Sequence, residues 1–438
     1  MDTILVVDDE EKIRKTLRGV LTDEGFAVAE AVNGRRALDF IEHNQPRLAI
    51  VDIWMPELDG IELVAAIRKR APELPVIVIS GHGLIETAMR VAQLGAFQFL
   101  EKPFTLDALL DTVARALGRA RPRAPMPELR TTPIPPLRPR LSPGVDARIR
   151  VTHPERTVAR GVVASGLGLH SGARTGLVLE ALPPGSGIIF GSISSGETVP
   201  ALVDWVESTD YATTLRRGGM TARTVEHLMA ALHAYGITNL FVKMQGEVPI
   251  LDGAAAEFCT LIESAGVIEQ DREVSEIVID RCYSVGKDEE GEKYLAIEPA
   301  DEFSIDYTLE YPHPVGRQRC VFRLTSPGAF KAEIAGARTF GFVREVAALE
   351  AKGLAAGGRL HNCVLIGDDG VVNAPLRFPD EFSRHKILDI MGDFYLLGRP
   401  LRGKVTARRT GHADNIVLVR QLRAQFGVRP DFSLRILN

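Results

Sequence analysis

The sequence has few cysteines, no excess of basic side chains and no long hydrophobic run. Its four cysteines lie far apart and form no C-x-x-C pair, which favours free thiols in a reducing compartment over a disulfide framework. No segment approaches the roughly 18 consecutive apolar residues that a membrane-spanning helix needs. We therefore expect any contact with lipid to be peripheral or to occur through a substrate.

The amino terminus and the charge balance narrow the location and the class of partner. The chain opens MDTILVVDDE, which lacks the basic start and the apolar core of a secretory signal, so the sequence predicts a cytoplasmic protein. A net charge of -5 gives no general attraction to nucleic acid. With 438 residues, 45 % of them hydrophobic, the chain is long enough for two or three globular domains.

The first part of the chain has the pattern of an α/β domain. In residues 1–120, short apolar runs such as ILVV, LAIVD and PVIVIS alternate with amphipathic helical stretches. This alternation predicts a doubly wound fold with a parallel sheet. Residues 121–147 are dense in proline and arginine, which predicts an extended linker between this domain and the rest of the chain.

The remaining residues, 148–438, mix predicted strands with long helices, which favours an α+β architecture. Strands followed by one long polar-striped helix occur around residue 227 and again around residue 385. We interpret this recurrence as two similar layers, formed by residues 148–272 and 273–438. If the layers face each other, the two helices come together.

Polar side chains end several predicted strands of the first domain. They are Asp8, Asp9, Asp52, Ser80 and Lys102. In an open parallel sheet these strand ends meet at one edge, where ligands gather. A bound Mg²⁺ would relieve the repulsion between the carboxylates. Asp52 could then attack a phosphoryl group whose oxygens contact Lys102 and Ser80. Each residue alone could instead cap a helix or turn.

The motifs VVDDE, VDIWMPELDG, ISGHGLIETA and GAFQFLEKPF make residues 1–120 resemble the receiver domain of response regulators. The resemblance implies that Asp52 is the phosphoacceptor and that a sensor histidine kinase or another phosphodonor is the partner. It also implies Mg²⁺ held by Asp9, Asp52 and the backbone carbonyl of Trp54. Asp8 would act mainly through water.

A second set of polar residues lies in the segment SRHKILDIMGD. Its His385, Asp389 and Asp393 recur at four-residue steps and would share one face of a helix. His385 and Asp389 could clamp a divalent metal, and a catalytic zinc site needs a third protein ligand, for which His227 in TVEHLMAAL is the best candidate. The alternative is a hydrated helix face with a few salt bridges. The same donor types also suit Fe²⁺.

Further residues fit amide hydrolysis around such a metal. Glu226 stands beside His227 and could accept a proton from a water molecule whose pKa the metal lowers. His412, in a predicted glycine-flanked turn within RTGHADN, could protonate the departing amine while Asp393 orients its ring. Thr339 in GARTFGF is a candidate hydroxyl donor to the developing oxyanion.

The motifs GLGLHSG, TVEHLMAAL, EVPILDGAAAEF, ARTFGF, RHKILDIMGD and TGHADN make residues from about 150 to 430 resemble the zinc-dependent UDP-3-O-acyl-N-acetylglucosamine deacetylases of lipid A synthesis. The resemblance implies a fold of two similar α+β layers packed face to face. It implies Glu226 as base and His412 as proton donor. The implied zinc ligands are His227, His385 and Asp389.

The same resemblance implies contacts with the substrate UDP-3-O-acyl-N-acetylglucosamine. Lys386 would lie near its nucleotide-sugar end, and Leu169 of GLGLHSG would also contact it. An insertion in the second layer would form an apolar tunnel for the acyl chain. The candidate lining residues are Phe340, Phe342, Val346 and Leu349. The alternative is an amphipathic helix that closes over its own core.

We therefore predict a zinc-dependent deacetylase that releases acetate from this UDP-sugar and is joined to a phosphorylatable receiver domain that tunes it. The alternative is a phosphorelay signalling or scaffold protein whose deacetylase-like part binds ligand without turnover. A response regulator that binds DNA is disfavoured, since the sequence has no evident helix-turn-helix and is acidic overall.

Overall fold

The computed structural model describes most of the chain. The described residues are 2–53, 55, 57–80, 94–101, 104–118, 140–143, 149–193, 195–289, 291–359, 362–372 and 375–427. Trp54 and Lys102 lie outside these ranges, and so does most of the predicted linker. Within the described ranges, no helix combines the length and the apolar character that crossing a membrane requires.

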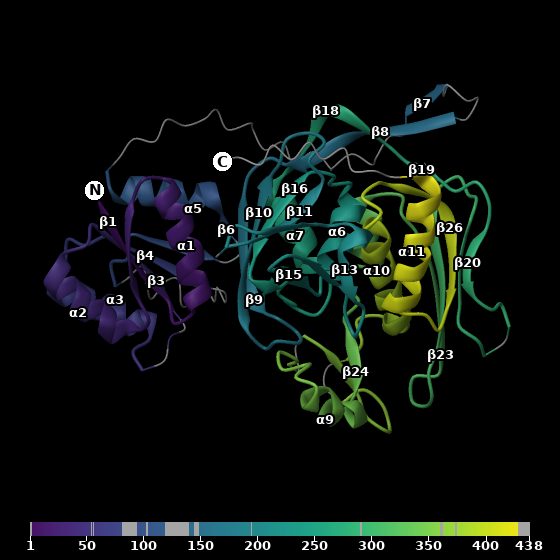
Figure 1. Ribbon diagram of the computed structural model, residues 1–438. Helices are drawn as coiled ribbons and strands as arrows, with labels where there is room; N and C mark the ends of the chain where they lie inside the picture. The colour runs from purple at the N-terminus through teal and green to yellow at the C-terminus, as the bar shows by residue number, and fades with distance from the viewer. Residues whose placement is uncertain are drawn as a thin grey trace.

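The amino-terminal part is a five-stranded parallel sheet with helices on both faces (Figure 1). The strands, in the order β2-β1-β3-β4-β5, are β1 (Thr3–Val7), β2 (Ala27–Ala31), β3 (Leu48–Asp52), β4 (Val76–Ser80) and β5 (Gln98–Glu101). The described helices are α1 (Glu11–Asp23), α2 (Gly34–Asn44), α3 (Gly60–Arg70) and α5 (Leu106–Ala116). Residues of α2 and α3 pack on one face and residues of α1 and α5 on the other. The predicted doubly wound fold is confirmed.

A six-stranded sheet and a four-stranded sheet form the first layer of the larger part. The six-stranded sheet has the order β12-β11-β16-β10-β9-β6, with β6 (Phe104–Thr105), β9 (Val162–Leu167), β10 (Arg174–Ala181), β11 (Ile188–Ser192), β12 (Thr198–Pro200) and β16 (Leu240–Met244). The four-stranded sheet contains β13 (Val206–Ser208), β14 (Thr214–Arg217), β15 (Met220–Arg223) and β17 (Gly246–Glu247). The helical elements are η1 (Val203–Trp205), α6 (Glu226–Tyr235) and α7 (Ala256–Ala265). A separate three-stranded sheet joins β7 (Arg140–Pro143), β8 (Ile149–Val158) and β18 (Val267–Ser275).

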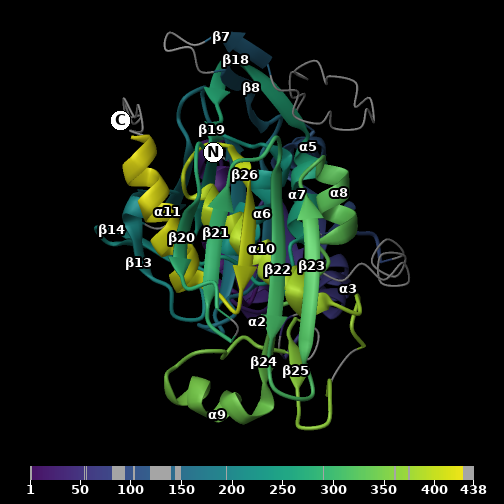
Figure 2. The same cartoon turned by 90° about the vertical axis from the view of Figure 1, so that its right-hand side faces the viewer.

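The second layer faces the viewer in Figure 2. Its sheet has the order β20-β21-β26-β22-β23, with β19 paired to β26; the strands are β19 (Ile277–Val278), β20 (Tyr283–Gly286), β21 (Tyr294–Glu298), β22 (Phe303–Glu310), β23 (Arg317–Arg323) and β26 (Leu401–Arg408). The helices are α8 (Pro327–Glu333), α10 (Glu381–Tyr395) and α11 (His412–Phe426). A small projection contains β24 (Phe340–Phe342), α9 (Val343–Ala351) and β25 (Val364–Ile366) (Figure 2).

The helices α6 and α10 lie against each other between the two layers, as the prediction of facing layers required (Figure 1). Every residue of α6 is buried, and one apolar cluster takes side chains from both layers. The backbones approach closely at Gly392, where an added Cβ would stand 2.0 Å from the carbonyl oxygen of Glu226. The predicted α+β architecture is therefore confirmed, and α6 and α10 form its centre.

Candidate active site

The polar stripe of α10 is buried rather than hydrated. His385, Asp389 and Asp393 are 3 %, 2 % and 0 % exposed. They project from one face of the helix because residues four apart lie one above the other. Since α10 packs against α6, this face points at the start of α6, where Glu226 and His227 lie. The alternative of a solvated helix face is therefore wrong.

Three of these side chains converge at one point. His227, His385 and Asp389 bring possible ligand atoms within 4.8 Å of one another. Oδ1 of Asp389 lies 3.5 Å from Nε2 of His385 and 3.9 Å from Nε2 of His227. The two imidazole rings meet edge to face, with centroids 5.0 Å apart. Nδ1 of His385 lies 3.1 Å from the carbonyl oxygen of Ala337, so we assign its proton to Nδ1, which leaves Nε2 with a free lone pair.

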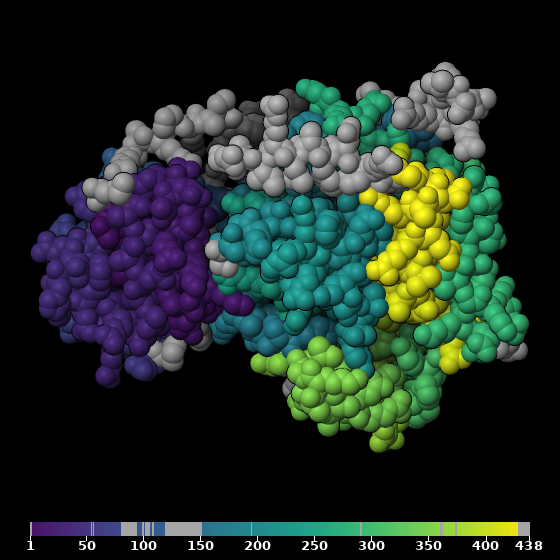
Figure 3. All heavy atoms as spheres, in the orientation of Figure 1, coloured from purple at the N-terminus to yellow at the C-terminus, as the bar shows by residue number. Residues whose placement is uncertain are grey.

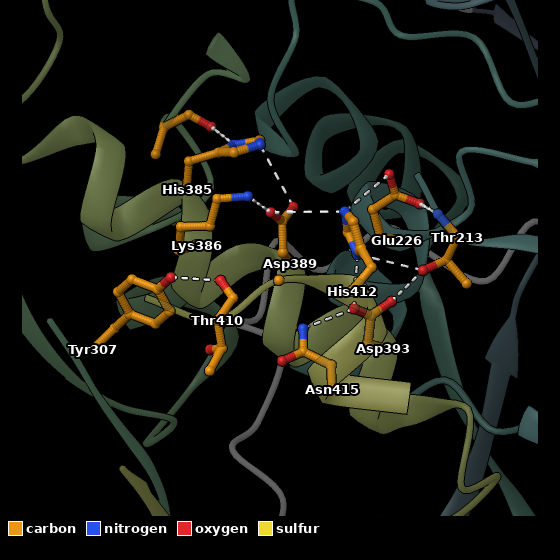
Figure 4. Close-up of polar contacts among 12 residues, drawn as sticks. Thr213, Glu226, Tyr307, His385, Lys386, Asp389, Asp393, Thr410, His412 and Asn415 are labelled. Atoms are coloured by element: carbon orange, nitrogen blue, oxygen red, sulfur yellow. Dashed lines mark hydrogen bonds and ion pairs between the residues drawn. The ribbon is translucent and has the colours of Figure 1, made fainter. Parts of the chain in front are cut away.

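Glu226 and His412 stand beside this trio (Figure 4). Nε2 of His412 lies 3.9 Å from Oε1 of Glu226 and 3.9 Å from Oδ2 of Asp389. On the other side of its ring, Nδ1 of His412 faces Oδ2 of Asp393 at 2.8 Å. The predicted turn around His412 is in fact the start of α11, with Gly411 at the N-cap. One ring nitrogen thus faces the trio while the other is held by a carboxylate.

Burial and neighbouring charges give the two groups opposite protonation states. Burial raises the pKa of Glu226 to about 7, although the positive charge of His412 lowers it in part. Burial lowers the pKa of His412, but the charges of Asp393 and Asp389 outweigh it and raise the pKa to about 10. Near pH 8, Glu226 is therefore mostly a carboxylate and His412 mostly an imidazolium.

The trio is in the protonation state that metal ligation requires. Burial, and then the charge of His385, lower the pKa of His227 to about 3. Burial also lowers the pKa of His385. Burial alone would raise the pKa of Asp389, but Lys386 and His385 hold it well below its usual range. Nζ of Lys386 donates to Oδ2 of Asp389 at 2.9 Å. Two neutral imidazoles therefore face one carboxylate.

Thr213, just before β14, connects Glu226 with Asp393, the carboxylate that holds His412. The sequence interpretation missed Thr213. Its backbone N–H donates to Oε2 of Glu226 at 3.0 Å, and its hydroxyl donates to Oδ1 of Asp393 at 2.6 Å. Asn415 donates to the other oxygen of Asp393 at 2.8 Å (Figure 4). No spacing signal marks Thr213, because it is separated from Asp393 by 180 positions.

The remaining predicted substrate residues differ in their contacts. The ring of Phe340 has its centroid 6.1 Å from that of His385, with Nζ of Lys386 5.7 Å from the Phe340 ring centre. Thr339 precedes Phe340, and its backbone bonds to Gly253. The carbonyl oxygen of Leu169 accepts a hydrogen bond at 2.9 Å from the backbone of the loop after α9.

The predicted insertion corresponds to the projection that contains α9. Within α9, no residue is buried, and Val346 and Leu349 are half-buried. Phe342 is 6 % exposed and belongs to the main core cluster, as the core-closing alternative expected. Among the four candidate lining residues, Phe340 has a ring contact with His385.

A second acidic group lies at the edge of the parallel sheet. Asp8, Asp9 and Glu10 bring carboxylate oxygens within 4.8 Å of one another, and Glu10 was not among the predicted residues. Asp52 ends β3, which pairs in parallel with β1, so it lies at the same edge. Ser80 ends β4, the next strand. The side chain of Ser80 and the whole of Lys102 lie outside what the structure describes.

Comparisons with known proteins match both parts of the chain. The family model of the response regulator receiver domain matches residues 4–114, and the family model described as UDP-3-O-acyl N-acetylglycosamine deacetylase matches residues 155–424. The second match spans more than half of the chain. The receiver match contains the group formed by Asp8, Asp9 and Glu10, and the deacetylase match contains the group formed by His227, His385 and Asp389.

Individual relatives agree with these matches. The chain is 46 % identical over 272 residues to the UDP-3-O-acyl-N-acetylglucosamine deacetylase of Myxococcus xanthus (strain DK1622), an alignment that covers 61 % of this chain and 86 % of that protein. It is 39 % identical over 270 residues to the enzyme of the same name from Wolinella succinogenes, covering 61 % and 90 %. The receiver domain of NtrX from Brucella abortus is 47 % identical, covering 27 % of this chain and 99 % of that one, with a TM-score of 0.26.

Proposed function

Because the chain belongs to the UDP-3-O-acyl N-acetylglycosamine deacetylase family and carries a receiver domain, we propose that it hydrolyses the acetamide of UDP-3-O-acyl-N-acetylglucosamine and releases acetate. This reaction belongs to lipid A synthesis, and we place the protein in the cytoplasm. The observation that carries the proposal is that a buried base, Glu226, and an acid with little exposure, His412, both adjoin one set of metal-binding donors.

The donor set fits a divalent metal. Oδ1 of Asp389, which faces Nε2 of both imidazoles, is buried and has no hydrogen-bond partner among the described residues. Buried polar atoms are costly unless something binds them. Two imidazoles and one carboxylate, with a fourth position open, form a typical donor set of catalytic zinc. We propose Zn²⁺ held by His227, His385 and Asp389; the same donors also suit Fe²⁺.

The bound metal would polarise the acetamide carbonyl and acidify a water molecule. Glu226 accepts a proton from the attacking water. Its raised pKa of about 7 suits this role, since a base with a pKa near the working pH can both take a proton and release it again. His412 gives a proton to the departing amine, and Asp393 holds its ring in position through Nδ1. The hydroxyl of Thr339 donates a hydrogen bond to the oxyanion of the tetrahedral intermediate.

Substrate binding is assigned to residues around this centre. Lys386, a cation held by Asp389, binds near the nucleotide-sugar end of the substrate. Phe340 lines the path of the acyl chain, and Leu169 contacts the substrate from the loop that adjoins the α9 projection. We propose that the projection covers the acyl chain.

We propose that the receiver domain accepts a phosphoryl group on Asp52 from a sensor histidine kinase or another phosphodonor. Asp9 and Asp52, with the Trp54 carbonyl, would hold Mg²⁺. Asp8 would act through water, and Lys102 and Ser80 would contact the phosphoryl oxygens. A small phosphodonor with Mg²⁺ should label the protein, and Asp52→Ala should abolish the labelling. Equal labelling of Asp52→Ala contradicts this part.

Acetate release tests the enzymatic part. Purified protein with its zinc content determined on the same sample should release acetate from the UDP-sugar, and Glu226→Ala should lose about 10² to 10⁴ in rate while it retains zinc. No acetate release by the wild-type protein would favour the alternative, a scaffold that only binds ligand. A rate for Glu226→Ala equal to that of the wild type would remove Glu226 as the base. Turnover before and after phosphorylation tests whether the receiver tunes the enzyme; equal turnover would remove that proposal.

A further inference from the structure

The receiver domain covers the outer face of the first layer's sheet. Along β10, Leu177 and Leu179 join the core between the layers, whereas Val178 between them joins a cluster formed mainly by the receiver. Val178 pairs across the strands with Val163 of β9, which belongs to the same cluster. Because side chains alternate along a strand, Val163 and Val178 point to the outer face, and the receiver removes them from water.

The contact between the two parts is close. An added Cβ on Gly176, two residues before Val178, would stand 3.1 Å from Oγ1 of Thr16 in α1. The strand β6, which precedes α5, pairs antiparallel with β9 at the edge of the sheet. The backbone N–H of Leu106 also donates to the carbonyl oxygen of Gly161 at 3.0 Å. Figure 1 shows α1 beside β9 and β10, and Figure 3 shows atoms of the receiver, in purple, against the teal atoms of the larger part.

Arg174 begins β10 and lies on the same outer face as Gly176 and Val178, since the three positions are two apart. Its guanidinium group forms an ion pair with Glu10 of the receiver. The Arg174 side chain is 54 % exposed, while that of Glu10 is 12 % exposed. A cation from the deacetylase therefore reaches the acidic group of the receiver.

The charge of Arg174 acts on the whole acidic group. Burial lowers the pKa of Arg174, but the hydrogen bond and charge of Glu10, followed by the charges of Asp9 and Asp8, raise it. Oδ1 of Asp9 and Oε2 of Glu10 are buried and have no hydrogen-bond partner among the described residues. These oxygens are the ones that a second cation would approach, and Arg174 would repel it.

We propose that Arg174 is a cationic residue of the receiver's acidic site, supplied by the deacetylase, and that it weakens Mg²⁺ binding there. This inference rests on the proposed Mg²⁺ site of the receiver and is independent of the deacetylation reaction. Because coupling between two binding events is reciprocal, Mg²⁺ in turn weakens the contact of Arg174 with Glu10. Loading the receiver thus loosens one contact with the sheet that carries the deacetylase.

Titration calorimetry of the full-length protein with Mg²⁺ alone tests the inference. Arg174→Gln should bind Mg²⁺ about three- to tenfold more tightly than the wild type at low salt, and the difference should shrink at high salt. Arg174→Lys keeps the charge and should stay near the wild-type affinity. Arg216→Gln is the matched control, because Arg216 is also 54 % exposed and pairs with a glutamate, Glu207, within the deacetylase.

The outcomes separate the inference from its premise. Unchanged Mg²⁺ affinity in Arg174→Gln, with binding that disappears in Asp9→Asn, overturns the role of Arg174 and leaves the Mg²⁺ site standing. An equal gain in Arg216→Gln also overturns it, since a general loss of positive charge would then explain the effect. A wild-type protein that binds no Mg²⁺, or binds it equally well after Asp9→Asn, overturns both the Mg²⁺ site and the inference.

Discussion

At the scale of single residues, the site depends on surroundings that leave Glu226 deprotonated and His412 protonated near pH 8. Glu226 is buried and the side chain of His412 is only 9 % exposed, and loss of water by itself disfavours the charged form of each. His412 keeps its proton because Asp393 lies 2.8 Å from Nδ1. The charge of His412 lowers the pKa of Glu226, whereas the charge of Asp393 raises it. Its pKa therefore falls in the range where a base can both take and return a proton.

The pKa values predict a bell-shaped pH profile. Glu226 must be deprotonated and His412 protonated, so kcat/KM should rise as the pH passes about 7 and fall as it passes about 10. Asp393→Asn removes a charge that holds the proton on His412, so the basic limb should move to lower pH. Steady-state kinetics from pH 5 to pH 11 measure both limbs. A basic limb at the same pH in Asp393→Asn would contradict the assigned pairing.

Removal of the Thr213 hydroxyl should lower kcat. Thr213→Val leaves the N–H bond to Glu226 but takes a hydrogen bond from the buried carboxylate of Asp393. We expect the activation free energy to rise by about 1.4 kcal/mol because His412 is held less well through Asp393. This rise corresponds to a decrease of about tenfold in kcat, with little change in KM. Thr213→Ser should restore the rate, and Thr214→Val at the next position is the control. A wild-type kcat in Thr213→Val would show that the hydroxyl does not position the acid.

The residues of the stripe could be predicted from sequence, but their connections could not. His385, Asp389 and Asp393 stand out because their spacing matches one helix face. Thr213 does not, since a threonine before a short strand has many ordinary roles and its partners lie far along the chain. Glu10 follows two predicted site residues, yet only the fold places its carboxylate with theirs.

At the scale of elements, the convergence of α6 and α10 is the feature on which the site depends. His233 of α6 lies 3.0 Å from the carbonyl oxygen of Met391 of α10 through Nδ1, and its ring stacks on Tyr395 with centroids 4.5 Å apart. Tyr395 in turn donates to the carbonyl oxygen of Ile237 at 2.8 Å. These contacts fix the two helices in register behind the polar stripe.

Gly392→Ala should disrupt this contact. The added Cβ would stand 2.0 Å from the carbonyl oxygen of Glu226, so the helices must separate at a cost of about 1–3 kcal/mol. We expect a lower melting temperature of the deacetylase and a loss of acetate release. Gly19→Ala in α1 is the control: no atom lies within 4 Å of its added Cβ, and the change should be neutral or slightly stabilising. Equal melting curves for Gly392→Ala and the wild type would contradict the close packing.

The sequence of β10 has the pattern of a strand that is covered on both faces. Its sequence RTGLVLEA has three consecutive apolar residues, Leu177, Val178 and Leu179, where a strand with one wet face would alternate. Such a run indicates a strand covered on both faces. The sequence could therefore have shown that something covers β10, but not that the cover is the receiver.

At the scale of the whole molecule, the receiver and the deacetylase are joined by packing as well as by the chain. Val178→Asp should separate them, because it would place a carboxylate in an apolar cluster under α1. Small-angle X-ray scattering should then give a larger radius of gyration than for the wild type. Val321→Asp is the control, since Val321 is 51 % exposed on β23. Equal radii for Val178→Asp and the wild type would show that the contact does not hold the two parts together.

The parts of the molecule were predictable from sequence, whereas their contact was not. Alternating apolar runs and helices predicted the parallel sheet. The recurrence of strands followed by a long polar-striped helix, together with the family resemblance, predicted the two layers. The contact depends on α1, Gly176 and Arg174 together, and none of these carries a recognisable pattern alone. The proline-rich segment predicted an extended linker and gave no sign of a shared apolar cluster.

We propose that one metal ion binds between α6 of the first layer and α10 of the second layer. Anomalous diffraction at the zinc edge from crystals of the zinc-loaded protein tests it most directly. We expect one strong peak about 2.0–2.2 Å from a nitrogen of His227, a nitrogen of His385 and an oxygen of Asp389. A peak that lies elsewhere, or one bound by α10 without His227 of α6, would contradict it.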